Sequence, residues 1–219
     1  MIASSTMRCA PLEEWTVSSL FKVLSLRFGG DTGSLDEDAI LQLVVAARAG
    51  DRAAGQRLYR QHVDRVFRTV RGILHSDMDA EEVTQDTMLA MLTSLDRYAP
   101  RTGTRFAAWV TTIAVNTARR RFRRRRPELT DPSDLPQIPD DTADLERDAD
   151  SEKQREVLLR ALAVLDERER EIISLRYGAE LDATEIASLL ELEPANVRKI
   201  LERARGRIEA QLNPNGDRT

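Results

Sequence analysis

The stretch that decides the fold is DATEIASLLELEPANVRKILERARGRI, residues 182–208. Apolar residues recur at helical intervals on each side of residues 191–193, which predicts two helices joined by a tight turn. Asp182 and Glu185 have the spacing of a capping box at the start of the first helix. Pro194 fits the first position of the second helix, where its missing N–H removes no hydrogen bond. The stretch therefore predicts a helix-turn-helix.

The second of these helices is strongly cationic. Its inward face is expected to carry Val197, Leu201, Ala204 and Ile208. Its other faces hold five cations and one acid, which suits a helix that lies along phosphates in the major groove. The same charges could instead pair along a solvated face, because Arg198, Glu202 and Arg205 are spaced for it. The turn and the cations together favour DNA contact by Arg198, Lys199, Glu202, Arg203, Arg205 and Arg207.

Hydrophobic periodicity continues toward the N-terminus and predicts an all-α protein of two small helical domains. Residues 153–212 form the second domain, in which Asp166 and Glu169 predict the start of a further helix. Residues 36–126 form the first domain, with Asp51 as a helix cap and a D-x-x-E start signal at Asp79 and Glu82. The sequence lacks the series of short alternating β-branched runs that an all-β fold requires.

Three segments fall outside these two domains. Residues 127–152 contain four prolines among aspartates and too little apolar surface to fold alone, so we expect an acidic linker. Residues 213–219 are expected to form a tail. Residues 1–35 are expected to form an extension with a short amphipathic helix, which docks on its own protein, docks on nothing, or meets a membrane or partner. The apolar face of that helix would carry Val17, Leu20, Phe21, Leu24 and Phe28.

Charge is strongly segregated along the chain. The formal net charge of −4 at first argues against nucleic acid as a partner. However, seven of the eight residues from Arg119 to Arg126 are arginine. The stretch from Glu128 to Glu152 then contains ten acidic residues and one basic residue, Arg147. Adjacent blocks of opposite sign indicate two surfaces that match different partners.

The composition excludes several classes of site. Cys9 is the single cysteine, so an internal disulfide and a cysteine-based metal site are both excluded. His62 and His75 stand apart from any ligand cluster, and we expect neither a metal nor a cofactor. The Gly-rich segment 29–34 lacks the lysine of a phosphate-binding loop. With no apolar run long enough to span a bilayer and no signal-peptide pattern, the expected location is the cytoplasm.

The arginine block continues a helix that carries a second candidate nucleic-acid surface. One face of this helix holds Asn116, Arg119, Arg120 and Arg123. Such a cationic face binds single-stranded DNA when aromatic rings are available for stacking, and Tyr98 and Phe106 are close enough in sequence to contribute. Phe106 and Trp109 are nevertheless expected first as core residues. The arginines could also act as a general attractor for RNA or membranes.

Three stretches, in the same order, resemble characteristic stretches of the sigma-70 family of bacterial RNA polymerase sigma factors. DAEEVTQD at residues 79–86 and FAAWVTTIAVNTAR at residues 106–119 are similar to two helices of the family's first DNA-binding domain. The second DNA-binding domain of the family is similar to residues 165–177, 185–187 and 197–205. The lack of a third folded domain between them resembles the small extracytoplasmic-function group.

The resemblance implies a non-enzymatic subunit that directs core RNA polymerase to promoters and takes no small-molecule substrate. It implies that the helix at residues 79–86 binds the clamp helices of the largest polymerase subunits, and that the polymerase flap is a further contact. The implied contact residues are Asp79, Glu82, Gln85 and Asp86. An anti-sigma factor is a further expected partner, and it could hold the protein at the membrane.

The resemblance also implies how promoter DNA is divided between the two domains. The first domain would read the −10 element and would flip one non-template base into a pocket. The −10 residues would be Tyr98, Arg101, Thr104, Asn116, Arg119, Arg120 and Arg123. The cationic final helix would read the −35 element as duplex. The acidic linker would follow the basic channel that later carries RNA.

Two other interpretations stay open on the residues alone. A stand-alone helix-turn-helix regulator would explain the second domain but would leave the matched helices of the first domain without a role. An enzyme acting on nucleic acid lacks a catalytic cluster to support it. The chain also departs from the family at Ala195-Asn196, Ile200 and Glu202. These departures change the expected −35 sequence rather than the mode of binding.

Overall fold

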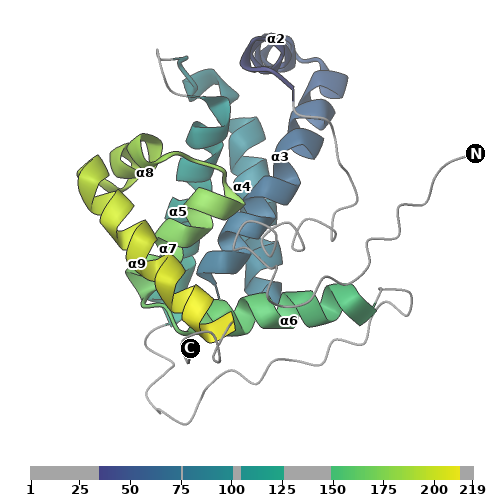
Figure 1. Ribbon diagram of the computed structural model, residues 1–219. Helices are drawn as coiled ribbons and strands as arrows, with labels where there is room; N and C mark the ends of the chain where they lie inside the picture. The colour runs from purple at the N-terminus through teal and green to yellow at the C-terminus, as the bar shows by residue number, and fades with distance from the viewer. Residues whose placement is uncertain (1–34, 75, 101–104, 126–148, 213–219) are drawn as a thin grey trace, which may run out of the picture.

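The computed structural model describes residues 35–74, 76–100, 105–125 and 149–212, and the regular structure of these segments is helical throughout (Figure 1). The expectation of an all-α fold is therefore confirmed. The predicted N-terminal amphipathic helix, the proline-rich part of the linker, His75 and the tail lie outside the described residues. Within the described part, no helix is both long enough and apolar enough to cross a membrane.

Helices α2 to α5 form an N-terminal bundle. Its elements are α2 (Glu37–Arg48), α3 (Arg52–Ile73), α4 (Asp77–Thr93), the short 3-10 helix η3 (Leu95–Arg97) and α5 (Phe106–Arg125). Asp51 caps α3 as expected, because its side chain accepts hydrogen bonds from the backbone N–H groups of Ala53 and Ala54. The core of the bundle contains the fully buried side chains of Leu58, Phe67, Met88, Met91 and Phe106.

The predicted start of α4 was wrong. The helix begins at Asp77, and its cap is Ser76, whose hydroxyl accepts from the backbone N–H of Asp79 at 3.3 Å. Asp79 therefore lies in the first turn of α4, not before it. Asp79 and Glu82 match the D-x-x-E pattern, but both carboxylates accept hydrogen bonds from Arg121 of the neighbouring helix rather than cap α4.

Helices α6 to α9 form a C-terminal bundle. Its elements are α6 (Ala149–Ala163), α7 (Glu167–Ile173), the π-helical turn η4 (Ser174–Gly178), α8 (Ala183–Leu190) and α9 (Pro194–Leu212). Asp166 with Glu169 and Asp182 with Glu185 form the two predicted capping boxes, which start α7 and α8. Pro194 is the first residue of α9, as expected.

The tight turn between α8 and α9 depends on one left-handed residue. Glu191 has a φ of 56° and ends α8, and the N–H of Leu192 donates to the carbonyl of Ala187 at 2.9 Å. The helix-turn-helix predicted from residues 182–208 is thus present. Its inward stripe is Val197, Ala204 and Ile208, with Leu201 partly buried and Ile200 buried as well. Ile200 therefore belongs to the core rather than to the exposed face of α9.

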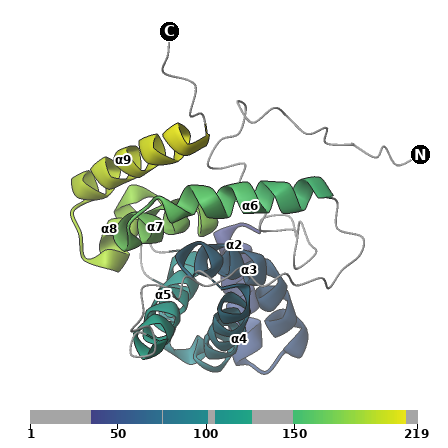
Figure 2. The ribbon, with the colours of Figure 1, turned by 90° about the horizontal axis from the view of Figure 1, so that it is seen from below.

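The two bundles pack against each other. Figure 2 shows α6, α7, α8 and α9 together on one side of the α2–α5 bundle. One buried cluster joins Ala108 and Val115 of α5 to Ile172, Leu175 and Leu181 of the C-terminal bundle. The side chains in this cluster are at most 9 % exposed, so the contact between the bundles has an apolar core of its own.

Candidate nucleic-acid interface

A carboxylate from a distant helix fixes the N-terminus of α5. Glu37 of α2 accepts a hydrogen bond from the backbone N–H of Phe106 at 2.6 Å. The first N–H groups of a helix lack partners within it, and the helix dipole favours an anion there. Glu37 thus satisfies one of these donors and anchors the helix that carries the arginine block.

The loop before α5 begins in the core. Tyr98 is 4 % exposed, and its ring meets the Phe106 ring edge-on, with the centroids 4.9 Å apart. Arg48 donates to the carbonyls of Leu95 and Tyr98 and so fixes the backbone at this point. Burial, followed by the negative charge of Glu37, raises the pKa of the Tyr98 hydroxyl.

The stacking role considered for Tyr98 does not fit its position, and Phe106 is a core residue, as expected first. Both rings lie in the core of the N-terminal bundle and contact Trp109 and each other. They support the loop from within in this conformation. The next −10 candidates along that loop, Arg101 and Thr104, lie outside the described residues.

The predicted −10 face of α5 is divided between solvent and the C-terminal bundle. Asn116 and Arg120 are exposed. Arg119 directly precedes Arg120 in α5, and its Nε donates to Glu171 of α7 at 2.8 Å. The amide of Asn116 and the guanidinium of Arg120 therefore lie at the surface, whereas Arg119 takes part in a contact between the bundles. The side chain of Arg123 lies outside the described residues.

The predicted −35 residues of α9 also separate into two groups. Arg198, Lys199, Glu202 and Arg205 are exposed. Arg203 and Arg207 donate to Glu169 of α7 at 3.0 and 2.8 Å, and Glu169 is only 1 % exposed. Both arginines hold α9 on α7, and their side chains are also 60 % and 48 % exposed, so each still borders solvent.

The alternative of an ion-pair ladder along α9 is not what the structure shows. Within the described residues, Arg198, Glu202 and Arg205 form no ion pair with one another. Arg205 instead lies 3.8 Å from Glu209, one turn further on and exposed. Arg198 and Lys199 therefore present their positive charges to solvent.

Helix α4 carries the four residues predicted to contact polymerase, and one of these four is buried. Asp79 is 5 % exposed and accepts from Arg121 of α5, with Nη2 and Oδ1 3.0 Å apart. The same guanidinium reaches the exposed Glu82 at 2.6 Å. The hydrogen bond to Asp79 raises the pKa of Arg121. Asp79 therefore orients Arg121 and does not itself face a partner.

The outer surface of α4 is a narrow stripe that mixes acidic and apolar side chains. Met78 and Leu89 are 71 % and 64 % exposed, and both lie on the helical face of Glu82, Gln85 and Asp86. We call these five residues the α4 stripe. The sequence pattern identified its polar members but not its two apolar ones, because amphipathic spacing favours a core role for any methionine or leucine.

The imidazole of His62 is buried without a polar partner among the described residues. His62 is 3 % exposed and packs beside Phe106, with ring centroids 5.2 Å apart. Among the described residues neither imidazole nitrogen has a hydrogen-bond partner. Burial, with the nearby positive charge of Arg65, lowers the pKa of His62 to about 3. The described residues also hold no cluster of three or more histidine, cysteine or carboxylate side chains that could bind a metal ion.

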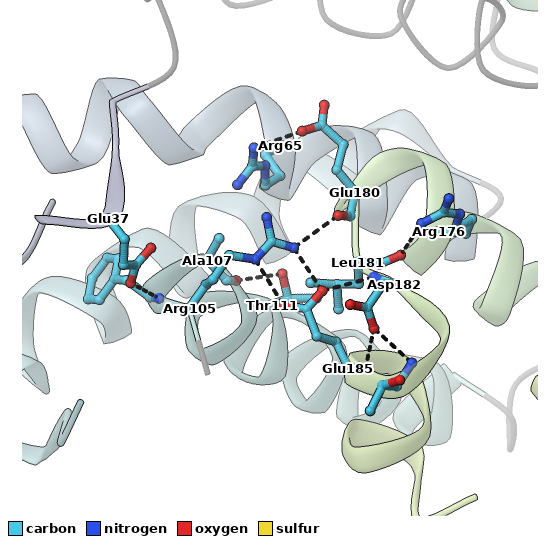
Figure 3. A network of polar contacts seen from close by, with 12 residues as sticks. Glu37, Arg65, Arg105, Ala107, Thr111, Arg176, Glu180, Leu181, Asp182 and Glu185 are labelled. Atoms are coloured by element: carbon cyan, nitrogen blue, oxygen red, sulfur yellow. Dashed lines mark hydrogen bonds and ion pairs between the residues drawn. The ribbon is translucent and has the colours of Figure 1, made fainter. Parts of the chain in front are cut away.

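Polar contacts between the bundles were not visible in the sequence. Arg105, just before α5, donates to both carboxylate oxygens of Glu185 at 2.9 and 2.7 Å and to the carbonyl of Glu180 at 3.1 Å (Figure 3). Arg65 of α3 donates to the Glu180 carboxylate at 2.9 Å. The hydrogen bond with Glu185 raises the pKa of Arg105. Cationic side chains of one bundle thus meet carboxylates of the other.

Two family regions match the chain. Sigma-70 region 2 matches residues 58–128, and sigma-70 region 4 matches residues 153–208. The chain is 34 % identical over 134 residues to the ECF RNA polymerase sigma factor ShbA of Streptomyces griseus, covering 59 % of this chain and 70 % of ShbA. It is 28 % identical over 190 residues to the ECF RNA polymerase sigma factor BldN of Streptomyces coelicolor, covering 84 % and 69 %.

Solved structures share the fold. CnrH, in complex with the cytosolic domain of CnrY, superposes with a TM-score of 0.58 at 24 % identity, covering 80 % of this chain and 97 % of CnrH. The sigma factor RpoE of Bartonella quintana, in complex with the anti-sigma factor NepR, gives a TM-score of 0.52 at 20 % identity, covering 83 % and 97 %.

Proposed function

Because the chain belongs to the extracytoplasmic-function group of sigma-70 family RNA polymerase sigma factors, we propose that it reads both promoter elements with separate helices. Residues 36–126 would bind core polymerase and the −10 element, and residues 153–212 the −35 element, with residues 127–152 as linker. One observation carries this assignment: exposed cationic side chains lie on two helices, α5 and α9, that belong to two different bundles.

Helix α9 is the proposed −35 reader. Arg198 and Lys199 lie near its N-terminal end, the part of a recognition helix that reaches base edges in the major groove. Their exposure and lack of ion pairs within the described residues support direct contact with DNA. Glu202 and Arg205 continue the exposed face. Arg203 and Arg207 would support the reader by holding α9 on α7 through Glu169.

Helix α5 is the proposed −10 reader. The exposed amide of Asn116 offers both a donor and an acceptor to an unpaired base, and Arg120 one turn on offers charge to the backbone. Glu37 and Arg48 hold the start of α5 and the preceding segment in place. A rigid support of this kind favours a site that must bind separated strands, because unpairing each base costs a few kcal/mol.

The α4 stripe is the proposed polymerase surface. Exposed methionine and leucine side chains beside acidic ones suit a protein interface, in which an apolar centre contributes affinity and charged groups fix orientation. The partner would then present a basic and apolar surface, as the clamp helices expected from the family would. A stand-alone regulator is the second candidate, but it leaves the α4 stripe without a partner.

RpoE was solved in complex with the anti-sigma factor NepR, which supports proposing an anti-sigma partner for this chain too. A membrane-held anti-sigma factor would keep the protein at the membrane, and after release the protein would act in the cytoplasm with core polymerase.

A co-purification experiment tests the assignment. Full-length protein is mixed with bacterial core polymerase, and the complex is isolated by gel filtration. Wild-type protein should co-elute, and Asp86→Lys should not, since it reverses a charge in the α4 stripe. Lys199→Glu is the matched control, because it reverses an exposed charge in the other bundle and should still co-elute. Failure of the wild type to bind would remove the assignment, and equal loss in both variants would show that the effect is not specific to α4.

A further inference from the structure

An open groove lies at the end of the N-terminal bundle where α2 meets α3. It is formed by the end of α2, the first turns of α3, and the end of α4 with η3. Its volume is about 590 Å³, which is within the size range of pockets that bind ligands. Its uncharged lining includes Ala47, Gly55, Tyr59, Leu92 and Leu95. None of the described groove residues belongs to the surfaces proposed above for DNA or polymerase.

Gly55 opens the floor of this groove. It lies within α3, where alanine would stabilise the helix better than glycine does. Among the described residues outside its own helix, a Cβ added at Gly55 would come within 4 Å of one atom, Cδ2 of Leu92 at 3.8 Å, which is an ordinary contact. Neither helix formation nor packing within the bundle therefore requires this glycine. A glycine does, however, let another segment approach the backbone of α3 closely.

The rim of the groove is cationic. Arg52 and Arg60 line it from α3, about two turns apart on one face, and both are exposed. Neither forms an ion pair within the described part of the chain. The one carboxylate of the described lining, Asp51, caps α3 through the N–H groups of Ala53 and Ala54. The groove therefore suits an occupant that combines apolar side chains with carboxylates.

Residues 13–28 lie outside the described residues, and their sequence has this combination in one helical register. One face of a helix here would carry the five apolar residues Val17, Leu20, Phe21, Leu24 and Phe28. One turn before Val17, Glu13 continues that face and Glu14 borders it. The face therefore consists of apolar side chains with two carboxylates at its N-terminal end, which complements the apolar floor and the cationic rim of the groove.

The chain is long enough to bring this segment to the groove. The described residues begin at Leu35, whose side chain packs on the core of the N-terminal bundle. From Glu37 at its start, α2 runs about 15 Å to Ala47 in the groove, at 1.5 Å per residue. Residues 29–34 could span roughly 20 Å if extended, and they contain three glycines, which allow the connection to turn back along α2.

We propose that residues 13–28 form an amphipathic helix that docks in the groove, so that its two carboxylates meet the guanidiniums of Arg52 and Arg60. The apolar face of the docked helix covers Tyr59 and the floor around Gly55. The interaction is intramolecular, and it goes beyond the proposed function without depending on it.

Docking would also brace the segment that leads toward α5. Leu95 lines the groove, and its carbonyl accepts a hydrogen bond from Arg48. The same guanidinium donates to the carbonyl of Tyr98. A helix seated against Leu95 therefore limits the motion of this support, and the backbone amides near it should exchange more slowly when the groove is filled.

Photo-cross-linking in the full chain tests the location of the docked segment. The photoreactive amino acid p-benzoylphenylalanine replaces Tyr59 in the groove. In a control protein it replaces Val164 of the C-terminal bundle, because the two side chains are 37 % and 38 % exposed. After irradiation in dilute solution, mass spectrometry should place cross-links from the Tyr59 position, but not from the Val164 position, in residues 13–28 of the same chain. Cross-links to residues 127–148, to a second copy of the chain, or only to the described helices would overturn the proposal.

An exchange of charges tests the contact at the rim. Glu13→Arg with Glu14→Arg should lower the yield of the groove cross-link, because like charges then meet. Adding Arg52→Glu with Arg60→Glu should restore the yield. Arg57→Glu is the control, since Arg57 is exposed on the same helix but outside the groove lining, and it should not restore the yield. A loss that the exchanged pair does not restore would overturn the assigned contact.

Hydrogen exchange provides a second readout without a probe in the groove. Leu20→Asp with Leu24→Asp places charges on the apolar face of the segment. This variant should exchange about tenfold faster at the amides of residues 92–98 if the docked form outnumbers the free one ten to one. Ser18→Asp with Ser25→Asp changes the opposite face and should exchange as the wild type does. Equal rates in all three proteins would overturn the docking. Neither readout involves polymerase or DNA, so the docking can fail while the proposed function stands.

Discussion

Arg121 donates to Asp79 across 3.0 Å and so ties the C-terminal part of α5 to the first turn of α4. The proposed −10 reader, α5, and the helix that carries the proposed polymerase surface, α4, are therefore joined by a charged contact inside one bundle. Asp79 is buried, whereas Asp86 on the same helix is exposed. Two aspartates that look equivalent in the sequence motif thus differ in burial, and we expect them to differ in role.

The first prediction separates these two roles. Asp79→Asn should lower the free energy of unfolding by about 1–3 kcal/mol, because a buried charged hydrogen bond to Arg121 is weakened. Asp86→Asn should change it by less than about 0.5 kcal/mol, since the side chain is exposed, but it should weaken polymerase binding. Urea unfolding and core co-elution measure the two effects. Equal destabilisation by both variants would contradict the assignment.

A second prediction concerns the two groups of arginines on α9. Arg203→Ala should destabilise the protein, because it leaves the buried Glu169 with one partner fewer. Arg198→Ala should leave stability unchanged and weaken binding to −35 duplex DNA by about 1–3 kcal/mol. Thermal unfolding and a duplex-binding titration distinguish them. The idea fails if Arg198→Ala is the less stable variant, or if it binds the −35 duplex as tightly as the wild type.

The start of α5 provides a third prediction. Glu37→Ala should cost about 1 kcal/mol of stability, because the N–H of Phe106 loses its acceptor. Asp38→Ala, in the same turn of α2 but exposed, should cost less than half as much. Hydrogen exchange should also speed up at the first amides of α5 in the Glu37 variant alone. Unchanged exchange there would show that Glu37 does not cap the helix.

The fourth prediction is a pH dependence that arises from His62. Its pKa is about 3 in the folded protein and near 6.5 when unfolded, so between these values the unfolded chain binds a proton that the folded chain does not. The free energy of unfolding should therefore fall as the pH drops from 6.5 toward 3, by about 1.4 kcal/mol per unit from this residue. His62→Leu should flatten the profile. Parallel profiles for the two proteins would contradict the assigned pKa.

Local features of the structure were predictable from the sequence, and distant ones were not. The capping boxes at Asp166 and Asp182 were found because each pairs residues three positions apart. The turn at Glu191 followed from the break in periodicity between two apolar runs. Glu37 and Phe106 are 69 residues apart, and no local pattern connects them.

Burial was the second limit. Tyr98 and Asp79 were assigned to binding because their positions in the motifs suggested it, but both side chains point into the N-terminal bundle. A motif identifies which residues recur together, and it does not say which of them face inward. The packing of the two bundles was also beyond reach, because Gly178 and Thr69 approach each other from separate domains.

Run-off transcription with purified core polymerase tests the central claim most directly. On a promoter that the wild type uses, Asn116→Ala should bind core polymerase normally and yield about tenfold less transcript, because the amide contacts an unpaired base. Gln56→Ala, which truncates an exposed amide on α3, should transcribe as the wild type does. Absence of any promoter-specific transcript from the wild type, or full activity of Asn116→Ala, would contradict the account.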